Sequence, residues 1–295
     1  MFTRIGLFLI TNIAVLAVLS ISMRVLGIDQ MLAADGIGIN LTGLLIMAAI
    51  IGFAGSFISL AMSKWMAKRS MGVQLITQPT NSSERWLLET VRRQAEMANI
   101  GMPEVGIFNS PQPNAFATGM NRNNALVAVS SGLLNSMTQD EVEAVLGHEI
   151  SHVANGDMIT MGLIQGILNT FVIFISRVIG TFVDRVIFKN ERGFGIGYFV
   201  VSIIAELILG VFAAMIAAWF SRHREFRADA GGAQLAGKHK MIAALQRLSQ
   251  SQQEKSAMPN ELAAFGISGG LKHGIAAMLM THPPLEKRIE ALRNS

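Results

Sequence analysis

The sequence contains no cysteine and has few charged residues. Charged residues make up 15% of its 295 residues, whereas hydrophobic residues make up 51%. The lack of cysteine excludes disulfide bonds, thiolate metal ligands and cysteine nucleophiles. The low charge is atypical of a soluble domain. The net charge of +4, with no basic patch interleaved with aromatic residues, argues against a nucleic-acid partner.

The N-terminal part contains two uncharged apolar runs, from Ile5 to Met23 and from Ile37 to Met62. A helix of about 20 apolar residues is long enough to cross a bilayer. The first run is long for a signal peptide and no Ala-x-Ala site follows it, so we favour a retained anchor. Lys64, Lys68 and Arg69 follow the second run, and the positive-inside rule places the segment after Lys64 in the cytoplasm.

Two further apolar runs, Met158 to Ile175 and Gly195 to Phe220, are less regular. The first is short for a span and the second carries Glu206 in its middle, where an unpaired charge is costly. The segment between them fits poorly with an external loop because it is basic, with Arg185, Lys189 and Arg192. We expect two more transmembrane helices, with a membrane-buried or re-entrant helical pair as the alternative. Glu206 is expected to be a buried residue that pairs with an opposite charge.

The remaining, more polar parts of the chain show helix and strand patterns. Charged and apolar residues alternate at helical spacing from Ser83 to Ala98, which predicts an amphipathic helix. Val105 to Phe108 and Ala125 to Val129 are typical of short strands, and the cluster from Asn121 to Asn124 is typical of a turn. The Ser- and Gln-rich stretch from Ser249 to Ser256 predicts a loop.

The strongest motif is a His-Glu-Ile-Ser-His sequence that contains His148, Glu149 and His152. Positions i and i+4 lie on one face of a helix, so both imidazoles can bind one zinc ion. Zinc lowers the pKa of a bound water toward 7, and the intervening glutamate is placed to accept the proton of that water. The motif therefore predicts metal-assisted peptide hydrolysis with Glu149 as the catalytic base. The alternative is a surface helix that carries two unrelated histidines.

The residues around this motif favour a helix with defined ends. Thr138 and Glu141 have the Thr-x-x-Glu spacing of a capping box. Asn155 and Gly156 form a plausible stop after the second histidine. We expect the motif to lie on this helix.

A catalytic zinc site usually has three protein ligands and one open position. The candidates for the third ligand are Glu225, His223, Asp229 and Glu206. Glu225 and Asp229 would share a helix face, so Glu225 could bind the metal while Asp229 accepts a hydrogen bond from a ligand histidine. The alternative is a solvated acidic pair among arginines. If Glu225 binds, it must lie on the same side of the membrane as His148, and the chain between them crosses the membrane twice or not at all. His239 and His273 fall outside any motif and are expected on the surface.

Taken together, these motifs resemble those of the HtpX family of bacterial membrane metalloproteases, which is related to the CaaX prenyl endopeptidases. The resemblance covers nearly the whole chain. It rests on the paired N-terminal apolar runs, the His-Glu-Ile-Ser-His motif, residues 113–119 (PNAFATG), residues 224–229 (REFRAD), and residues 281–285 (THPPL) with Arg288. It implies a mainly α integral membrane protein with a zincin-like (gluzincin) α+β catalytic domain that contains a small β-sheet.

The resemblance also implies one Zn²⁺ per chain, bound by His148, His152 and Glu225, with Asp229 supporting a ligand histidine. A His/His/Glu ligand set favours zinc over other divalent ions. The expected organisation is two transmembrane helices in residues 1–62, a first catalytic part in 63–157, two transmembrane or membrane-buried helices in 158–220, and a second catalytic part in 221–295.

Further roles follow from the resemblance alone. His282 and Arg288 are implied to stabilise the oxyanion of the tetrahedral intermediate or to hold the substrate backbone, a role for preorganised donors. The alternative for His282 is a simple turn before the last helix. Asn114, Ala115 and Phe116 are expected to form or adjoin an edge strand that binds peptide by β-augmentation, or else a packed turn.

The resemblance implies a multi-pass protein of the bacterial inner (cytoplasmic) membrane with its active site facing the cytoplasm. Its expected substrates are damaged or unfolded membrane proteins and other unfolded polypeptides, including its own unfolded copies, which it would cleave. One alternative is an intramembrane protease, but the acidic residues that precede the motif on its helix favour a helix outside the bilayer. Another is a non-proteolytic membrane protein with a structural or sensory zinc site, although such sites tend to have four protein ligands and often cysteine.

Overall fold

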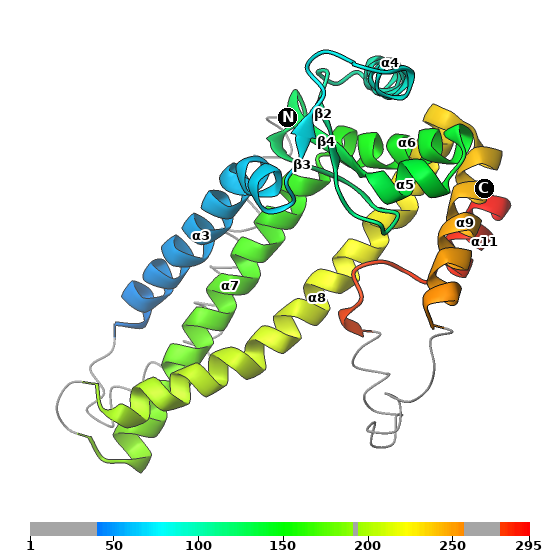
Figure 1. Ribbon diagram of the computed structural model, residues 1–295. Helices are drawn as coiled ribbons and strands as arrows, with labels where there is room; N and C mark the ends of the chain where they lie inside the picture. Colours follow the sequence, from blue (N-terminus) through cyan, green and yellow to red (C-terminus); the bar gives the residue numbers. More distant parts are fainter. Residues whose placement is uncertain (1–39, 191–193, 257–277) are drawn as a thin grey trace. The chain divides into compact units, whose positions relative to one another are not determined.

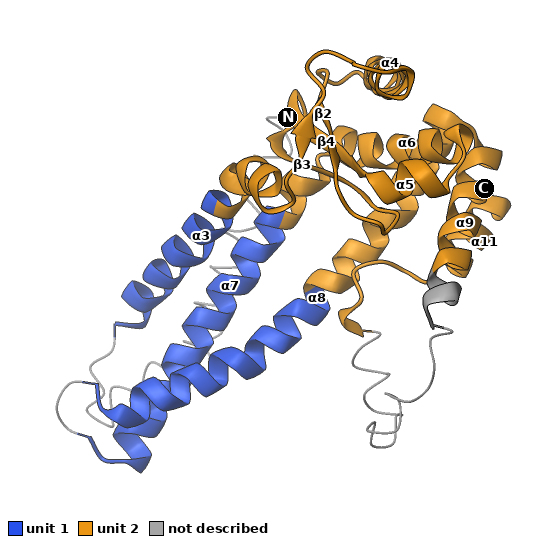
Figure 2. Cartoon of the chain, viewed as in Figure 1, with its two compact units in different colours: residues 1–58, 162–216 blue, residues 59–161, 217–295 orange. Residues whose placement is uncertain are grey.

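The computed structural model describes residues 40–190, 194–256 and 278–295, and these residues divide into two compact units (Figures 1 and 2). Unit 1 includes residues up to Ile58 and Gly162–Ile216, and unit 2 includes Ser59–Met161 and Ala217–Ser295. The predicted first span, Ile5 to Met23, lies outside the described residues. Three helices in the described part of the chain are long and apolar enough to cross a membrane: α3 (Leu41–Ser70), α7 (Asp157–Phe182, with its extension to Ile187) and α8 (Ile196–Ala236).

Within unit 1, α3 and α7 approach each other through small residues. A Cβ at Gly52 would lie 2.7 Å from Thr170 Oγ1, and the Ser56 hydroxyl donates a hydrogen bond to the carbonyl of Gly162. Small residues of this kind allow membrane helices to pack closely. By contrast, many apolar side chains of α8, such as Leu207, are more than half exposed among the described residues.

Glu206 on α8 forms an ion pair with Arg177 on α7, with 3.1 Å between the oxygen and the nitrogen. The expected pairing of Glu206 is therefore found, but the expected burial is wrong. The Glu206 and Arg177 side chains are 32% and 29% exposed. Between these helices, a short π-helix, η1 (Val183–Ile187), places the Asp184 carboxylate to accept hydrogen bonds from the backbone N–H groups of Gly195 and Tyr198.

Unit 2 contains a four-stranded mixed sheet in the order β1-β2-β4-β3. The strands are β1 (Gln74–Leu75), β2 (Glu104–Phe108), β3 (Ala115–Asn121) and β4 (Asn124–Ser130). β2 and β4 are parallel, and the other pairs are antiparallel. The two predicted strands correspond to β2 and β4, and the predicted Asn-rich turn joins β3 to β4. β3 is an edge strand, with β4 as its neighbour.

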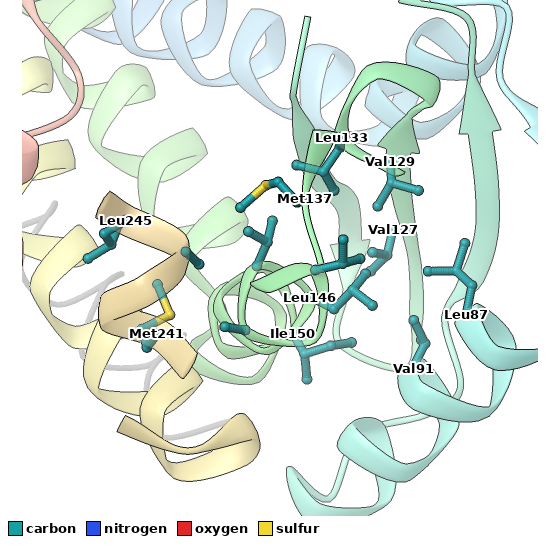
Figure 3. Close-up of a cluster of buried hydrophobic side chains, with 14 of the residues drawn as sticks. Leu87, Val91, Val127, Val129, Leu133, Met137, Leu146, Ile150, Met241 and Leu245 are labelled. Atoms are coloured by element: carbon teal, nitrogen blue, oxygen red, sulfur yellow. The ribbon is translucent and has the colours of Figure 1, made fainter. Parts of the chain in front are cut away.

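The core of unit 2 lies around helix α6 (Gln139–Asn155). Leu146 and Ile150 of α6 are fully buried between Val127 of β4, α4 (Ser82–Met97) and α9 (Lys238–Ser256) (Figure 3). The short helix α5 (Ser131–Ser136) and the last helix α11 (Leu285–Asn294) complete this unit. α6 is thus surrounded by sheet and helices, which fixes the orientation of its remaining face.

The loop predicted from Ser249 to Ser256 is wrong, because these residues continue α9. Glutamine is a good helix former, and Leu245 and Leu248 anchor the preceding turns to the core. The helix that contains the last apolar run is longer than the run itself, which ends at Phe220. α8 continues without interruption to Ala236 and ends at Gly237, whose φ of +106° is a conformation that favours glycine.

Candidate metal centre and active site

The ends of α6 place the His-Glu-Ile-Ser-His motif. The Thr138 hydroxyl accepts a hydrogen bond from the Glu141 backbone N–H, and the Glu141 carboxylate accepts one from the Thr138 N–H, which completes the predicted capping box. Gly156 adopts a left-handed conformation with φ of 67° and ends the helix at the predicted position. His148 and His152 therefore lie one turn apart on the same face.

Glycines allow α8 to approach this face very closely. An added Cβ at Gly232 would lie 2.9 Å from the backbone nitrogen of His148, and one at Gly231 would lie 2.5 Å from Ser151 Oγ. These distances are shorter than ordinary van der Waals contacts. Because the two backbones nearly touch, side chains less than two turns earlier on α8 reach the histidines.

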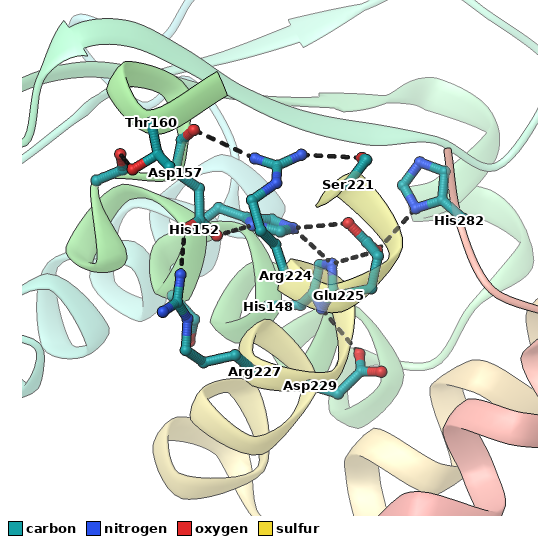
Figure 4. Close-up of polar contacts among 12 residues, drawn as sticks. His148, His152, Asp157, Thr160, Ser221, Arg224, Glu225, Arg227, Asp229 and His282 are labelled. Atoms are coloured by element: carbon teal, nitrogen blue, oxygen red, sulfur yellow. Dashed lines mark hydrogen bonds and ion pairs between the residues drawn. The ribbon is translucent and has the colours of Figure 1, made fainter. Parts of the chain in front are cut away.

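Three ligand atoms from the two helices converge (Figure 4). Nε2 of His152 lies 3.1 Å from Nε2 of His148. The Glu225 carboxylate oxygens lie 3.5 Å from His148 Nε2 and 3.3 Å from His152 Nε2. Two Zn–N bonds of 2.0–2.1 Å at a tetrahedral angle would hold their nitrogens roughly 3.3–3.4 Å apart, so the spacing fits a zinc ion. His148, His152 and Glu225 form a candidate metal site.

The other ring nitrogens support this interpretation. Nδ1 of His148 lies 2.9 Å from Asp229 Oδ1, and Nδ1 of His152 lies 2.7 Å from Asp157 Oδ2. A carboxylate at Nδ1 holds the proton there and leaves a lone pair on Nε2. Two such lone pairs that face each other at 3.1 Å repel, so the donor set fits a cation between them.

The surrounding charges also favour a positive charge at this place. Burial alone would lower the pKa of His152, but hydrogen bonds to Asp157 and Glu225 outweigh it and raise this pKa to about 9. Burial would raise the pKa of Glu225, but hydrogen bonds from His148 and His152 hold it well below its usual range. The site is therefore built for positive charge next to an ionised Glu225, which is only 1% exposed.

His282 and Arg288 both lie at this site, but in different environments. His282 is 62% exposed, and its Nδ1 lies 2.7 Å from Glu225 Oε2. Arg288 is buried and makes two hydrogen bonds to the Asp229 carboxylate, at 2.7 and 2.5 Å. Its Nη1 lies 3.4 Å from Glu225 Oε2. The exposed imidazole is open to a substrate, whereas the guanidinium holds Asp229 against His148.

A cavity of about 300 Å³ opens beside the metal centre. Glu149, half-buried, lines it together with His148, Arg288 and residues 282–285. The apolar part of the lining comes from α5, α6 and α9: Leu133, Val145, Met241, Ala244, Leu245 and Leu248. Asn114 and Ala115 also line it, whereas Phe116 packs against Phe108, with ring centroids 5.5 Å apart.

The other candidate ligands lie elsewhere. His223 is exposed and bonds through Nδ1 to the Trp219 carbonyl, and Glu206 belongs to unit 1. His239 is exposed, as expected, and His273 lies outside the described residues. The sequence prediction missed Asp157 and the apolar wall from α9. An acidic residue five positions after His152 was a usable signal, but Asn155 and Gly156 before it were interpreted only as a helix stop.

Comparisons with known proteins show similarity to proteases. Residues 81–295 match the model of peptidase family M48. The chain is 62% identical over 290 residues to a protein named Protease HtpX from Thioalkalivibrio sulfidiphilus, with 98% of each chain covered. It is 60% identical over 295 residues to a Protease HtpX homolog from Nitrosomonas europaea, with both chains fully covered.

A likeness to a solved structure supports the fold. The crystal structure of S. mikatae Ste24p superposes with a TM-score of 0.61 at 18% identity. The match covers 97% of this chain and 66% of the Ste24p chain. The mainly helical architecture with a small mixed sheet is thus shared with that protein.

Proposed function

The chain belongs to the HtpX proteases of peptidase family M48 and is a multi-span membrane metalloprotease, and we propose that it is a zinc endopeptidase that cleaves unfolded segments of damaged membrane proteins. The observation that carries the proposal is the convergence of His148, His152 and Glu225 beside Glu149 at the mouth of an apolar cavity. On this proposal, the first three are the metal ligands.

A bound Zn²⁺ would supply Lewis-acid polarisation of the peptide carbonyl and lower the pKa of a coordinated water to about 7. Glu149 accepts a proton from the attacking water and passes it to the leaving amine nitrogen. His282, exposed at the rim, donates to the carbonyl oxygen as that oxygen gains negative charge. Asp229 orients His148, and Arg288 holds Asp229 by two hydrogen bonds.

The cavity and the edge strand indicate the kind of substrate. β3 is an edge strand of the described sheet, so an extended peptide can add to its outer edge, and Asn114 and Ala115 at its start line the cavity. The apolar wall between α5 and α9 suits a bulky apolar side chain of the substrate. Apolar side chains on extended backbone are accessible in unfolded proteins and buried in folded ones, so this site selects damaged polypeptides, including unfolded copies of the chain itself.

The basic end of α3 supports a cytoplasmic active site. Lys64 and Lys68 form ion pairs with Glu104 on β2, the first at 3.0 Å. These residues belong to unit 2, which also carries the candidate metal site. Because lysines that flank a span favour the cytoplasmic side of the inner membrane, the catalytic unit is assigned to the cytoplasm.

The test compares wild type with Glu149→Gln, purified as full chains in detergent with a chelator and then supplied with zinc. Wild type should cleave casein and its own unfolded copies, while Glu149→Gln should bind zinc and cleave neither. Glu96→Gln, an exposed change on α4, is the control and should cleave normally. A zinc-loaded wild type that leaves every substrate intact would contradict the proposal, and equal activity of Glu149→Gln would exclude Glu149 as the base.

A further inference from the structure

Asp157 is a buried carboxylate that the proposed reaction does not use. It is the first residue of α7, follows the C-cap of α6 and is 0% exposed. Its Oδ2 lies 2.7 Å from His152 Nδ1, and its Oδ1 accepts a hydrogen bond of 2.9 Å from Arg227 Nη2. Its carbonyl oxygen accepts a hydrogen bond from Arg224 at 3.3 Å. Every one of these partners lies within unit 2.

An acidic residue in the first turn of a helix is commonplace because it interacts favourably with the helix dipole. Two observations go beyond that explanation. The carboxylate contacts Nδ1 of His152, on the side of the ring away from Glu225 (Figure 4). It is also held from its other oxygen by an arginine of α8, the helix that carries Glu225.

The same arrangement occurs at the other histidine. His148 contacts Asp229, and Asp229 is held by Arg288, whereas His152 contacts Asp157, and Asp157 is held by Arg227. Each imidazole thus has its own carboxylate, and each carboxylate has its own arginine. The two arginines differ in exposure, since the Arg288 side chain is 7% exposed and the Arg227 side chain is 59% exposed.

We propose that Asp157 is a positioning residue that orients His152 and keeps its proton on Nδ1, with Arg227 holding Asp157 in place. This inference rests on the proposed metal site and deepens it. An asparagine at 157 can turn its N–H₂ group toward Nδ1, which moves the ring proton to Nε2 and removes the lone pair from the ligand position. The effect acts on metal affinity, which is measurable without any substrate.

The experiment measures zinc affinity of the full chain in detergent by competition with a chromophoric chelator, with Co²⁺ absorption as a second readout. Asp157→Asn should weaken zinc binding by about 10–100-fold. Asp140→Asn is the matched control: it makes the same change on α6, at an exposed residue that pairs with Lys240, and it should bind zinc as wild type does. Arg227→Gln should weaken binding by about two- to fivefold, because the Arg227 side chain of this ion pair is 59% exposed and contributes modestly.

The possible outcomes distinguish a failure of the inference about Asp157 from a failure of the proposed metal site. If wild type binds zinc and Asp157→Asn binds it within twofold, Asp157 has no positioning role, even if the variant unfolds at a lower temperature. If Asp157→Asn does not fold, Arg227→Gln decides, and unchanged affinity and Co²⁺ absorption overturn the inference. A wild type that binds no zinc overturns the metal site itself and this inference with it.

Discussion

The close contact between α6 and α8 makes Gly232→Ala the most informative single change. The new Cβ would lie 2.9 Å from the backbone nitrogen of His148 and 3.1 Å from its Cα. Favourable non-bonded contacts require about 3.5 Å, so the helices must separate by roughly half an ångström. Neither neighbour is a flexible side chain that can turn away. The shift therefore moves His148 relative to Glu225.

The expected change in the free energy of unfolding has two parts. Replacing glycine by alanine inside a helix stabilises it by about 1 kcal/mol, and overpacking a close contact costs about 1–3 kcal/mol. Gly210→Ala isolates the first part, because Gly210 lies on the same helix and its added Cβ would have no atom within 4 Å. The difference between the two variants is thus about 1–3 kcal/mol, or roughly 2–10 °C in unfolding temperature.

The assay is thermal unfolding of both variants in detergent, followed by a zinc titration. Gly232→Ala should unfold at a lower temperature than Gly210→Ala. It should also bind zinc more weakly than wild type, because His148 has moved relative to Glu225. If the two variants have the same unfolding temperature and the same zinc affinity, then the backbones are not in contact at this glycine. In that case the explanation of how Glu225 reaches the histidines is wrong.

Three further predictions concern separate features of unit 2. Leu248→Trp narrows the apolar cavity, so the ratio of kcat/KM values for peptides with leucine and with glycine next to the scissile bond should fall about tenfold; an unchanged ratio would exclude the cavity as a subsite. Burial would raise the pKa of Glu104, but Lys68 and Lys64 together hold this pKa below its ordinary value of 4.5. The stabilisation by these ion pairs is present above pH 4.5 and is lost as the pH falls through the lower pKa of Glu104 in the folded chain. The unfolding temperatures of Glu104→Gln and wild type should therefore converge in acid, and a difference that stays constant with pH would refute this. Thr138→Ala removes half of the capping box and should destabilise the chain by about 1 kcal/mol in chemical unfolding, and no change would show that the cap is unimportant.

Local features of the site were predictable from the sequence because they depend on residues close together in the chain. The spacing of His148 and His152, the cap at Thr138 and the stop at Gly156 are all set within one helix, and the structure has them as predicted. The third candidate ligand was harder to predict, because it lies far from the motif in the sequence. Near the end of the last apolar run the sequence offered several acidic residues and a histidine, and residue types alone do not say which of them reaches the motif. The shared helix face of Glu225 and Asp229 favoured Glu225 as the ligand, and the family resemblance strengthened that prediction.

The missing information was the docking of α8 on α6. Since α8 continues past Phe220 as one helix, its residues take fixed positions around its axis. Glu225 and Asp229, four residues apart, meet the Nε2 and Nδ1 sides of His148, while Arg227 reaches Asp157 behind His152. One short stretch of α8 therefore supplies a candidate ligand, Glu225, and contacts that support both imidazoles. Changes that shift this helix should alter all these contacts together, whereas changes in the His-Glu-Ile-Ser-His motif should alter them one at a time.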